Sequence, residues 1–81
     1  MYVAVGDKIY TFYEHALSRM KDRGIQFEWV EMALLTPDDV TQLTTLRYAY
    51  DKMLADDKSI RVVVDEAERQ IVTVYYTETE E

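Results

Sequence analysis

The spacing of the hydrophobic positions changes along the first third of the chain. The segment Tyr2–Phe12 alternates apolar and polar residues in two short extended pieces around a Gly6-Asp7 turn, which is typical of a β-hairpin. From residue 13 the spacing becomes helical, with apolar side chains at Ala16, Leu17 and Met20. Gly24 stands where a glycine commonly follows a helix end. The pattern therefore predicts a hairpin and then a helix over residues 13–23.

A second helix is predicted over residues 26–36. Its apolar positions Phe27, Val30 and Leu34 form a wide stripe suited to packing on a sheet, and Pro37 ends the helical pattern. Gln26 is a weak residue for capping its start. Three strand-like runs follow: Thr41–Leu54, Ser59–Asp65 and Ile71–Thr77. The short loops at 55–58 and 66–69 indicate an antiparallel three-stranded meander.

Separate helical and strand-rich regions indicate an α+β fold with two layers. We expect residues 1–81 to form one domain, a helical hairpin packed on a three- to four-stranded, mainly antiparallel sheet in the order β-α-α-β-β-β. Val72, Val74 and Tyr76 would face the helices. The other sheet face is then solvated or covered by a partner, and residues 78–81 form a frayed acidic tail.

Composition narrows the possible functions. The chain has 81 residues, 9 Lys and Arg against 16 Asp and Glu, and a net charge of −7. The absence of cysteine excludes disulfides, thiol nucleophiles and Cys-ligated metals, and a single histidine excludes sites built from several imidazoles. No apolar run approaches the ~20 residues of a membrane span, and no signal peptide opens the chain. We therefore expect a cytoplasmic protein with no membrane contact. Because its aromatic content is 12%, we also expect a homodimer.

Metal and nucleotide cofactors are not expected. The carboxylate pairs at 38–39, 56–57 and 65–66 lack the spacing of a calcium loop and are typical of solvated loops. The two glycines, Gly6 and Gly24, are too few for a glycine-rich phosphate loop.

Three basic side chains recur every four residues on the first predicted helix: His15, Arg19 and Arg23. This spacing places them on one helix face, where like charges oppose helix formation. Two interpretations stay open. Neighbouring acids such as Glu14 and Asp22 would pair with the cations, or an anionic ligand such as a phosphate would bind them. His15 is also the residue best suited to proton transfer near neutral pH.

A second candidate group lies on the predicted sheet. Arg61, Thr73 and Tyr75 alternate with residues expected to face the helices, so they would share the open face. There they could bind a phosphate or stack on a base. The alternative is an ordinary polar sheet surface, because Thr and Tyr are good strand formers.

The segment His15-Ala16-Leu17-Ser18-Arg19-Met20-Lys21-Asp22-Arg23-Gly24-Ile25 resembles the pattern His-Ala-x-x-Arg-Met-x-x-Arg-Gly-Ile. This pattern is typical of a small prokaryotic family, the domain-of-unknown-function family numbered 4258. The strand-like runs Ile60–Asp65 and Ile71–Tyr75 fit it as well. The resemblance extends over roughly residues 10–77, although Gln26 departs from the polar cap usual in that family.

The resemblance implies a distant similarity to RelE-type and BrnT-type toxins, which are small RNA-cleaving proteins. By this similarity His15, Arg19 and Arg61 would be catalytic in a metal-independent endoribonuclease. Arg23, Thr73 and Tyr75 would bind the substrate. RNA and an antitoxin would be the partners. The net charge of −7 opposes RNA binding, because phosphate contacts supply most of the affinity of RNA-binding proteins.

Two hypotheses therefore remain. A toxin-type ribonuclease predicts a basic concavity that holds His15, Arg19, Arg23 and Arg61. A non-catalytic protein-interaction or oligomerisation module predicts that Arg19 and Arg23 are paired with Asp or Glu.

Overall fold

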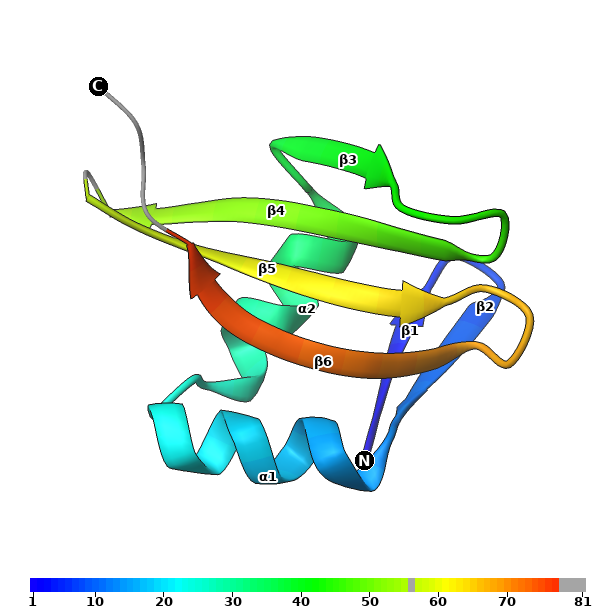
Figure 1. The fold of residues 1–81 in the computed structure, drawn as a ribbon, viewed down its shortest axis with the longest axis horizontal. Helices are drawn as coiled ribbons and strands as arrows, with labels where there is room; N and C mark the ends of the chain where they lie inside the picture. The colour runs from blue at the N-terminus through cyan, green and yellow to red at the C-terminus, as the bar shows by residue number, and fades with distance from the viewer. Residues whose placement is uncertain (56, 78–81) are drawn as a thin grey trace.

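The computed structural model describes residues 1–55 and 57–77, and within them the chain forms two helices and six strands (Figure 1). In chain order the elements are β1 (Tyr2–Val5), β2 (Lys8–Phe12), α1 (Glu14–Arg23), α2 (Phe27–Leu35), β3 (Asp39–Gln42), β4 (Arg47–Ala55), β5 (Lys58–Asp65) and β6 (Gln70–Thr77). The α+β class is confirmed.

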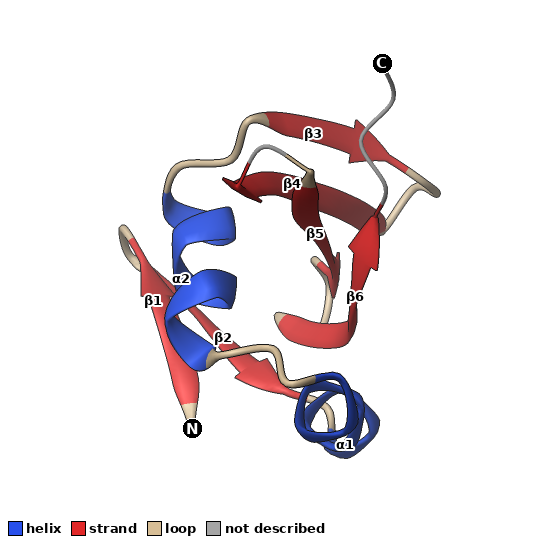
Figure 2. Ribbon diagram, turned by 90° about the vertical axis from the view of Figure 1, so that its left-hand side faces the viewer, coloured by secondary structure: helices blue, strands red, loops and turns tan. Residues whose placement is uncertain are grey.

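All the described strands belong to one mixed sheet, in the order β1-β2-β6-β5-β4-β3. Neighbouring strands are antiparallel except β2 and β6, which run parallel with Phe12 opposite Ile71. The Tyr13 amide donates a hydrogen bond to the Ile71 carbonyl at 3.0 Å and extends this short pairing by one residue. The sheet is curled, so that the β1–β2 hairpin lies beside α2 and across from β4 and β5 (Figure 2).

The predicted architecture is wrong in two respects. The sheet has six strands among the described residues rather than three or four, because the N-terminal hairpin joins the meander through β2 and β6 and β3 adds a further edge. The helices also do not form a hairpin that packs as a unit. α1 packs on β6, whereas α2 packs on β4, β5 and β1. The observed order is therefore β-β-α-α-β-β-β-β.

The local expectations agree better with the structure. The N-terminal hairpin is confirmed, with Val5 opposite Lys8, and so is the β4-β5-β6 meander. The single run expected from Thr41 to Leu54 is two strands. The Leu43 amide bonds the Arg47 carbonyl at 2.8 Å and closes the turn between them. All four residues of β3 are exposed, so this strand has no alternating pattern to reveal it.

Both helices begin and end close to their expected limits. Gly24 adopts φ 67° and ψ 29°, the left-handed conformation that ends many helices. The next amide, that of Ile25, donates to the Met20 carbonyl at 2.9 Å, and Ile25 is buried. Gln26 provides no side-chain cap for α2. The tail expected at 78–81 and residue 56 of the expected 55–58 loop lie outside the described residues.

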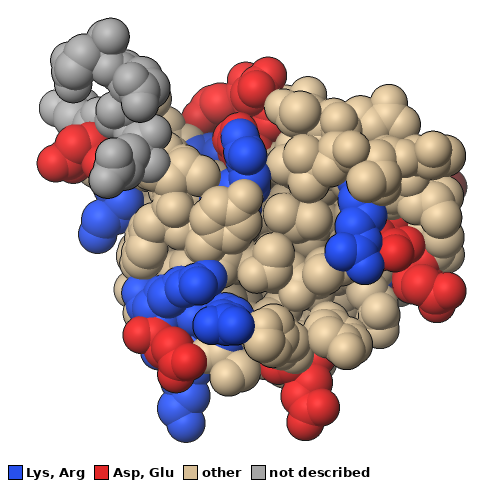
Figure 3. Space-filling view, in the orientation of Figure 1, with Lys and Arg blue, Asp and Glu red and all other residues tan. Residues whose placement is uncertain are grey.

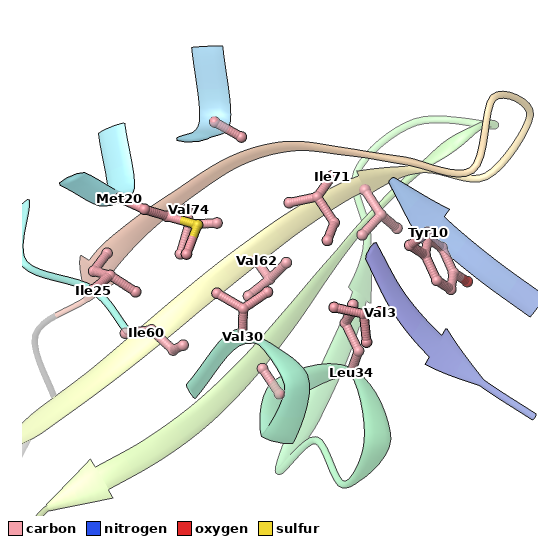
Figure 4. Close-up of a cluster of buried hydrophobic side chains, with 13 residues drawn as sticks. Val3, Tyr10, Met20, Ile25, Val30, Leu34, Ile60, Val62, Ile71 and Val74 are labelled. Atoms are coloured by element: carbon pink, nitrogen blue, oxygen red, sulfur yellow. The ribbon is translucent and has the colours of Figure 1, made fainter. Parts of the chain in front are cut away.

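The core fills the space between the helices and the concave face of the sheet. Val30 of α2 lies beside Val62, and Met20 of α1 lies beside Val74 (Figure 4). Val30, Val62 and Val74 are fully buried. Each such side chain contributes about 1.5–3 kcal/mol relative to an exposed one. This packing fixes α1 against β6 and thereby sets the position of the basic helix face.

Candidate functional site

His15 and Arg19 are in direct contact on the exposed face of α1. They are four residues apart, so their side chains lie one above the other. Arg19 Nε donates a hydrogen bond to His15 Nε2 at 3.0 Å. A guanidinium has donors only, so Nε2 is the unprotonated ring nitrogen in this contact, and the imidazole proton is assigned to Nδ1. The pair thus combines a proton acceptor with a fixed positive charge.

Arg23 follows one turn later, but its side chain is directed at the sheet. Its Nη1 donates a hydrogen bond to the Val74 carbonyl at 2.8 Å. β2 pairs with β6 only at Gln70 and Ile71, so beyond Ile71 no other strand of residues 1–55 and 57–77 lies along this edge of β6. Arg23 therefore satisfies a carbonyl at an open sheet edge, and it holds α1 alongside β6.

Carboxylates do not neutralise the helix cations within the described part of the chain. The ion pairs found there are Arg47–Asp65, Lys52–Asp38, Arg61–Asp51 and Arg69–Glu66. Neither Arg19 nor Arg23 takes part in one of these. The acid pairing of Arg19 and Arg23, expected for an interaction module, is thus wrong for residues 1–55 and 57–77.

An open pocket of about 420 Å³ lies beside the start of α1. Its lining residues are Tyr13, Glu14, His15 and Ser18. Of the four basic residues expected to share one concavity, His15 is the one that lines it. The imidazole therefore borders a solvent-accessible pocket, with the Arg19 guanidinium next to it.

Arg61 is engaged on the opposite face of the sheet from the helices. Its Nε and Nη2 donate to the two carboxylate oxygens of Asp51 at 2.7 and 3.0 Å, a bidentate ion pair. The Asp51 carboxylate, followed by Tyr75, raises the pKa of Arg61. In the register of the sheet, Arg61 lies between Asp51 on β4 and Tyr75 on β6. A phosphate at this position would compete with Asp51.

The sheet places Thr73 on the same outer face, opposite Val63. Val74 and Tyr76 contact the core as expected, but the expectation for Val72 is wrong. The register shifts between Val63 and Val64, a β-bulge, and Ile71 is buried in its place. Val72 instead lines a second pocket of about 310 Å³ with Tyr13, Arg47, Asp65, Glu68 and Gln70.

Charge is unevenly distributed over the surface that contains these groups. In Figure 3, basic side chains gather at the lower left, over the C-terminal half of α1, and most of the sheet face has no charge. Because the Debye length is about 8 Å at physiological ionic strength, a local basic surface can act within a protein of net charge −7.

The chain matches the family described as domain of unknown function (DUF4258) over residues 12–76. It belongs to this family. The expected family is confirmed, whereas the α1 motif as its signature and the similarity to RelE-type toxins stay predictions. No curated protein and no solved structure matches the chain.

The DUF4258 match extends from Phe12 to Tyr76, so it includes both helices, strands β3 to β5 and all of β6 except its last residue. It leaves out β1 and all of β2 except its last residue. Thus the motif helix and the sheet face with Arg61 belong to the family region, whereas most of the N-terminal hairpin does not.

No helix in the described residues is long and apolar enough to cross a membrane. The same residues contain no group of three or more His, Cys, Asp or Glu side chains arranged to hold a metal ion.

The structure also contains a polar cluster that the sequence did not indicate. Tyr10 Oη donates to the Glu66 carboxylate, at 2.9 Å from Oε2, and Tyr50 Oη donates to the same oxygen at 3.2 Å. Arg69 Nε lies 3.7 Å from Glu66 Oε1. Burial, then the hydrogen bond to Glu66, raises the pKa of Tyr10. Tyr10 and Glu66 are 56 residues apart, so no local pattern could reveal this contact.

Proposed function

We propose that this DUF4258 domain is a metal-independent endoribonuclease whose reactive groups are His15 and Arg19. The observation that carries the proposal is their contact at 3.0 Å on an exposed helix face beside an open pocket. A general base needs an available lone pair near the reacting oxygen, and a phosphate needs a directed cation. The pair supplies both within one helical turn.

The reaction uses the 2′-hydroxyl of RNA as the nucleophile. His15 Nε2 accepts the 2′-hydroxyl proton, the 2′ oxygen forms a bond to the adjacent phosphorus, and the bond from phosphorus to the 5′ oxygen breaks. The 5′ oxygen takes a proton from water. The products are a 2′,3′-cyclic phosphate and a free 5′-hydroxyl, and no redox change or cofactor is required.

Arg19 stabilises the charge that develops on the phosphate oxygens. Its Nε–H now bonds His15, so substrate binding requires the guanidinium to turn toward the phosphate, which frees Nε2. Arg61, Thr73 and Tyr75 would guide the RNA over the sheet face, and Arg23 would act mainly by holding α1 in place. The toxin-type setting, with an antitoxin as protein partner, belongs to the same proposal.

A cleavage assay tests this function. Purified protein is incubated with a labelled single-stranded RNA of mixed sequence in the presence of EDTA, across pH 5 to 9. We expect fragments that end in a 2′,3′-cyclic phosphate. His15→Gln should lower the rate at least about 100-fold, the usual contribution of a general base. DNA of the same sequence should stay intact, because it lacks the 2′-hydroxyl.

Lys21→Gln is the matched control, because it also replaces an exposed basic residue of α1 with glutamine but lies outside the pocket. It should cleave at the wild-type rate. RNA left intact over the whole pH range, or a His15→Gln variant as active as the wild type, contradicts the proposal. If His15→Gln loses both its activity and its folded circular dichroism signal, His15→Asn is tested in its place. For the proposal to hold, His15→Asn must fold and be inactive.

A second candidate, a protein-interaction module, is favoured by the N-terminal edge of the sheet. β1 is an edge strand whose residues Tyr2–Val5 carry no charge, although edge strands commonly carry charges that block pairing. Tyr2 and Ile9 of this hairpin are 58% and 55% exposed. A dimer that pairs through β1 would appear in light scattering, and Ala4→Lys should convert it to a monomer. A wild-type monomer at all concentrations contradicts this candidate.

A further inference from the structure

Tyr13 stands between two pockets. It lines the pocket beside His15 and also the pocket bordered by Val72 and Gln70. Its side chain is half-exposed, and it is the residue immediately before the first residue of α1. An aromatic ring with open pockets beside it is a stacking surface of the kind on which proteins bind unpaired RNA bases.

The second pocket has the volume of a small-ligand site and a mixed polar and apolar lining. Its volume is about 310 Å³, at the lower end of the usual range for ligand pockets, about 300–1,000 Å³. Tyr13 and Val72 provide apolar surface, while Arg47, Glu68 and Gln70 provide polar groups in the lining. The pocket can therefore hold a flat, partly polar ring.

Some polar side chains of the pocket lining already have hydrogen-bond partners, and others have none among the described residues. Asp65 Oδ1 already accepts the amides of Ala67 and Glu68, at 2.9 and 3.0 Å, and its other oxygen lies 3.7 Å from Arg47 Nε. In contrast, the Glu68 carboxylate and the Gln70 amide make no hydrogen bond to any described side chain or backbone group. The pocket lining thus offers an acceptor-only group from Glu68 and donors from Gln70 and Arg47.

We propose that this pocket binds the base on the 5′ side of the scissile phosphate and prefers guanine. The inference rests on the proposed function, because the 2′-hydroxyl that His15 deprotonates belongs to that nucleotide. Guanine presents two adjacent N–H donors, which match a carboxylate, next to the O6 acceptor, which matches an amide or guanidinium donor. Adenine presents an amino donor where guanine has O6, and that donor would face Gln70 and Arg47.

Binding of the base in this pocket also accounts for the acidic residues beside a site that cleaves RNA. Glu14 lines the pocket beside His15 and would repel a phosphate placed against it. The phosphate therefore lies on the Arg19 side of His15, one helical turn further along α1. The carboxylate of Glu68 meets the uncharged base and not the backbone, so its charge is used for recognition.

Binding of uncleavable dinucleotides tests the subsite separately from the reaction. GpU, ApU, CpU and UpU with a 2′-O-methyl group on the first nucleotide are titrated into the full chain and followed by amide NMR. We expect the largest shifts at Tyr13, Glu68 and Gln70, and GpU should bind about tenfold or more tighter than ApU. Glu68→Gln should reduce this preference to within about twofold.

Two further variants complete the design. Asp7→Asn removes one carboxylate in the β1–β2 turn, away from the pocket, and should keep the guanine preference. Tyr13→Leu should weaken all four dinucleotides by about tenfold, because stacking does not depend on the base. Equal binding of the four dinucleotides, or a preference that Glu68→Gln leaves unchanged, overturns the proposal.

The two proposals fail in different ways. If RNA is cleaved in a His15-dependent manner while Tyr13, Glu68 and Gln70 show no shifts, the base subsite is wrong and the nuclease function stands. If GpU binds at these amides and RNA is never cleaved, the subsite stands as a nucleotide-binding site and the nuclease function is wrong.

Discussion

The guanidinium of Arg23 and the carbonyl of Val74 are joined by a hydrogen bond of 2.8 Å between residues 51 positions apart. In the sequence Arg23 is the third basic residue of a helix face, after His15 and Arg19. In the fold it caps the edge of β6 at a point where β2 no longer pairs with that strand. The same side chain thus links α1 to the sheet on which this helix packs.

Replacing Arg23 should therefore lower the stability of the fold more than it changes RNA cleavage directly. Arg23→Gln shortens the side chain and removes its charge, so the Val74 carbonyl loses a charged donor. Such bonds contribute about 1.5–3 kcal/mol when buried, and we expect about 1–2 kcal/mol here because the contact is only partly buried. Urea denaturation measures the loss.

Lys21→Gln is the control for this experiment, because Lys21 is exposed in the same helical turn. It should change the free energy of unfolding by no more than about 0.5 kcal/mol. An Arg23→Gln variant as stable as the wild type but defective in RNA binding would show that Arg23 contacts substrate and does not cap the sheet.

Breaking the ion pair of Arg61 and Asp51 should lower the stability of the protein and raise its affinity for RNA. Asp51→Asn should lower the free energy of unfolding by about 0.5–1 kcal/mol, because the pair is bidentate but partly exposed. The same change releases the Arg61 guanidinium. If Arg61 guides RNA over the sheet face, Asp51→Asn should tighten RNA binding and Arg61→Gln should weaken it, as measured by fluorescence anisotropy.

Asp39→Asn separates the effect of Arg61 from that of net charge. Asp39 lies opposite Asp51 on the neighbouring strand β3, so its replacement removes the same charge from nearly the same surface and leaves the ion pair intact. If Asp39→Asn and Asp51→Asn tighten RNA binding equally, only net charge matters, and Arg61 has no specific part in binding.

Short-range patterns predicted the local structure well. The helical spacing of Ala16 and Met20 identified α1, and both residues are buried against the sheet. Gly24 marked its end, and Pro37 marked the end of α2. These features depend on side-chain period and backbone conformation, which a few neighbouring residues determine.

The pairing of distant segments could not be predicted in the same way. The parallel contact of β2 with β6 joins Phe12 to Ile71 over two residue pairs, and nothing in either strand specifies it. β3 has no buried residue, so its sequence lacks a hydrophobic signal. The four-residue spacing on α1 indicates that His15 and Arg19 can meet. The hydrogen bond of Arg23 to the Val74 carbonyl and the ion pair of Arg61 with Asp51 join distant segments, so no local pattern predicts them.

Gly24 allows a direct test of how α1 is terminated. Its φ is +67°, and a Cβ at this position would meet nothing within 4 Å. The cost of Gly24→Ala is therefore conformational only, and we expect a loss of about 1–2 kcal/mol in the free energy of unfolding. Gly24→Asn should lose less, because asparagine tolerates this conformation better. Equal losses for the two variants would show that backbone strain is not the cause.

The Tyr10–Glu66 contact predicts how stability changes at alkaline pH. The pKa of Tyr10 is raised in the folded protein, by burial and then by its hydrogen bond to Glu66. Below pH 10 both the folded and the unfolded chain keep the proton, so the full stabilisation is present. Above the unfolded pKa of about 10, the unfolded chain releases the proton first, and stability falls by up to about 1.4 kcal/mol per pH unit.

Tyr10→Phe removes this titration together with the hydrogen bond. We expect the variant to be about 1 kcal/mol less stable than the wild type at pH 7 and to lose stability less steeply between pH 10 and 11. Tyr50, whose pKa is also raised, keeps part of the slope in this variant. Tyr2→Phe changes an exposed tyrosine and should follow the wild-type curve. Parallel curves for the wild type and Tyr10→Phe, measured by urea denaturation at each pH, would show that Tyr10 does not hold its proton more tightly in the folded state.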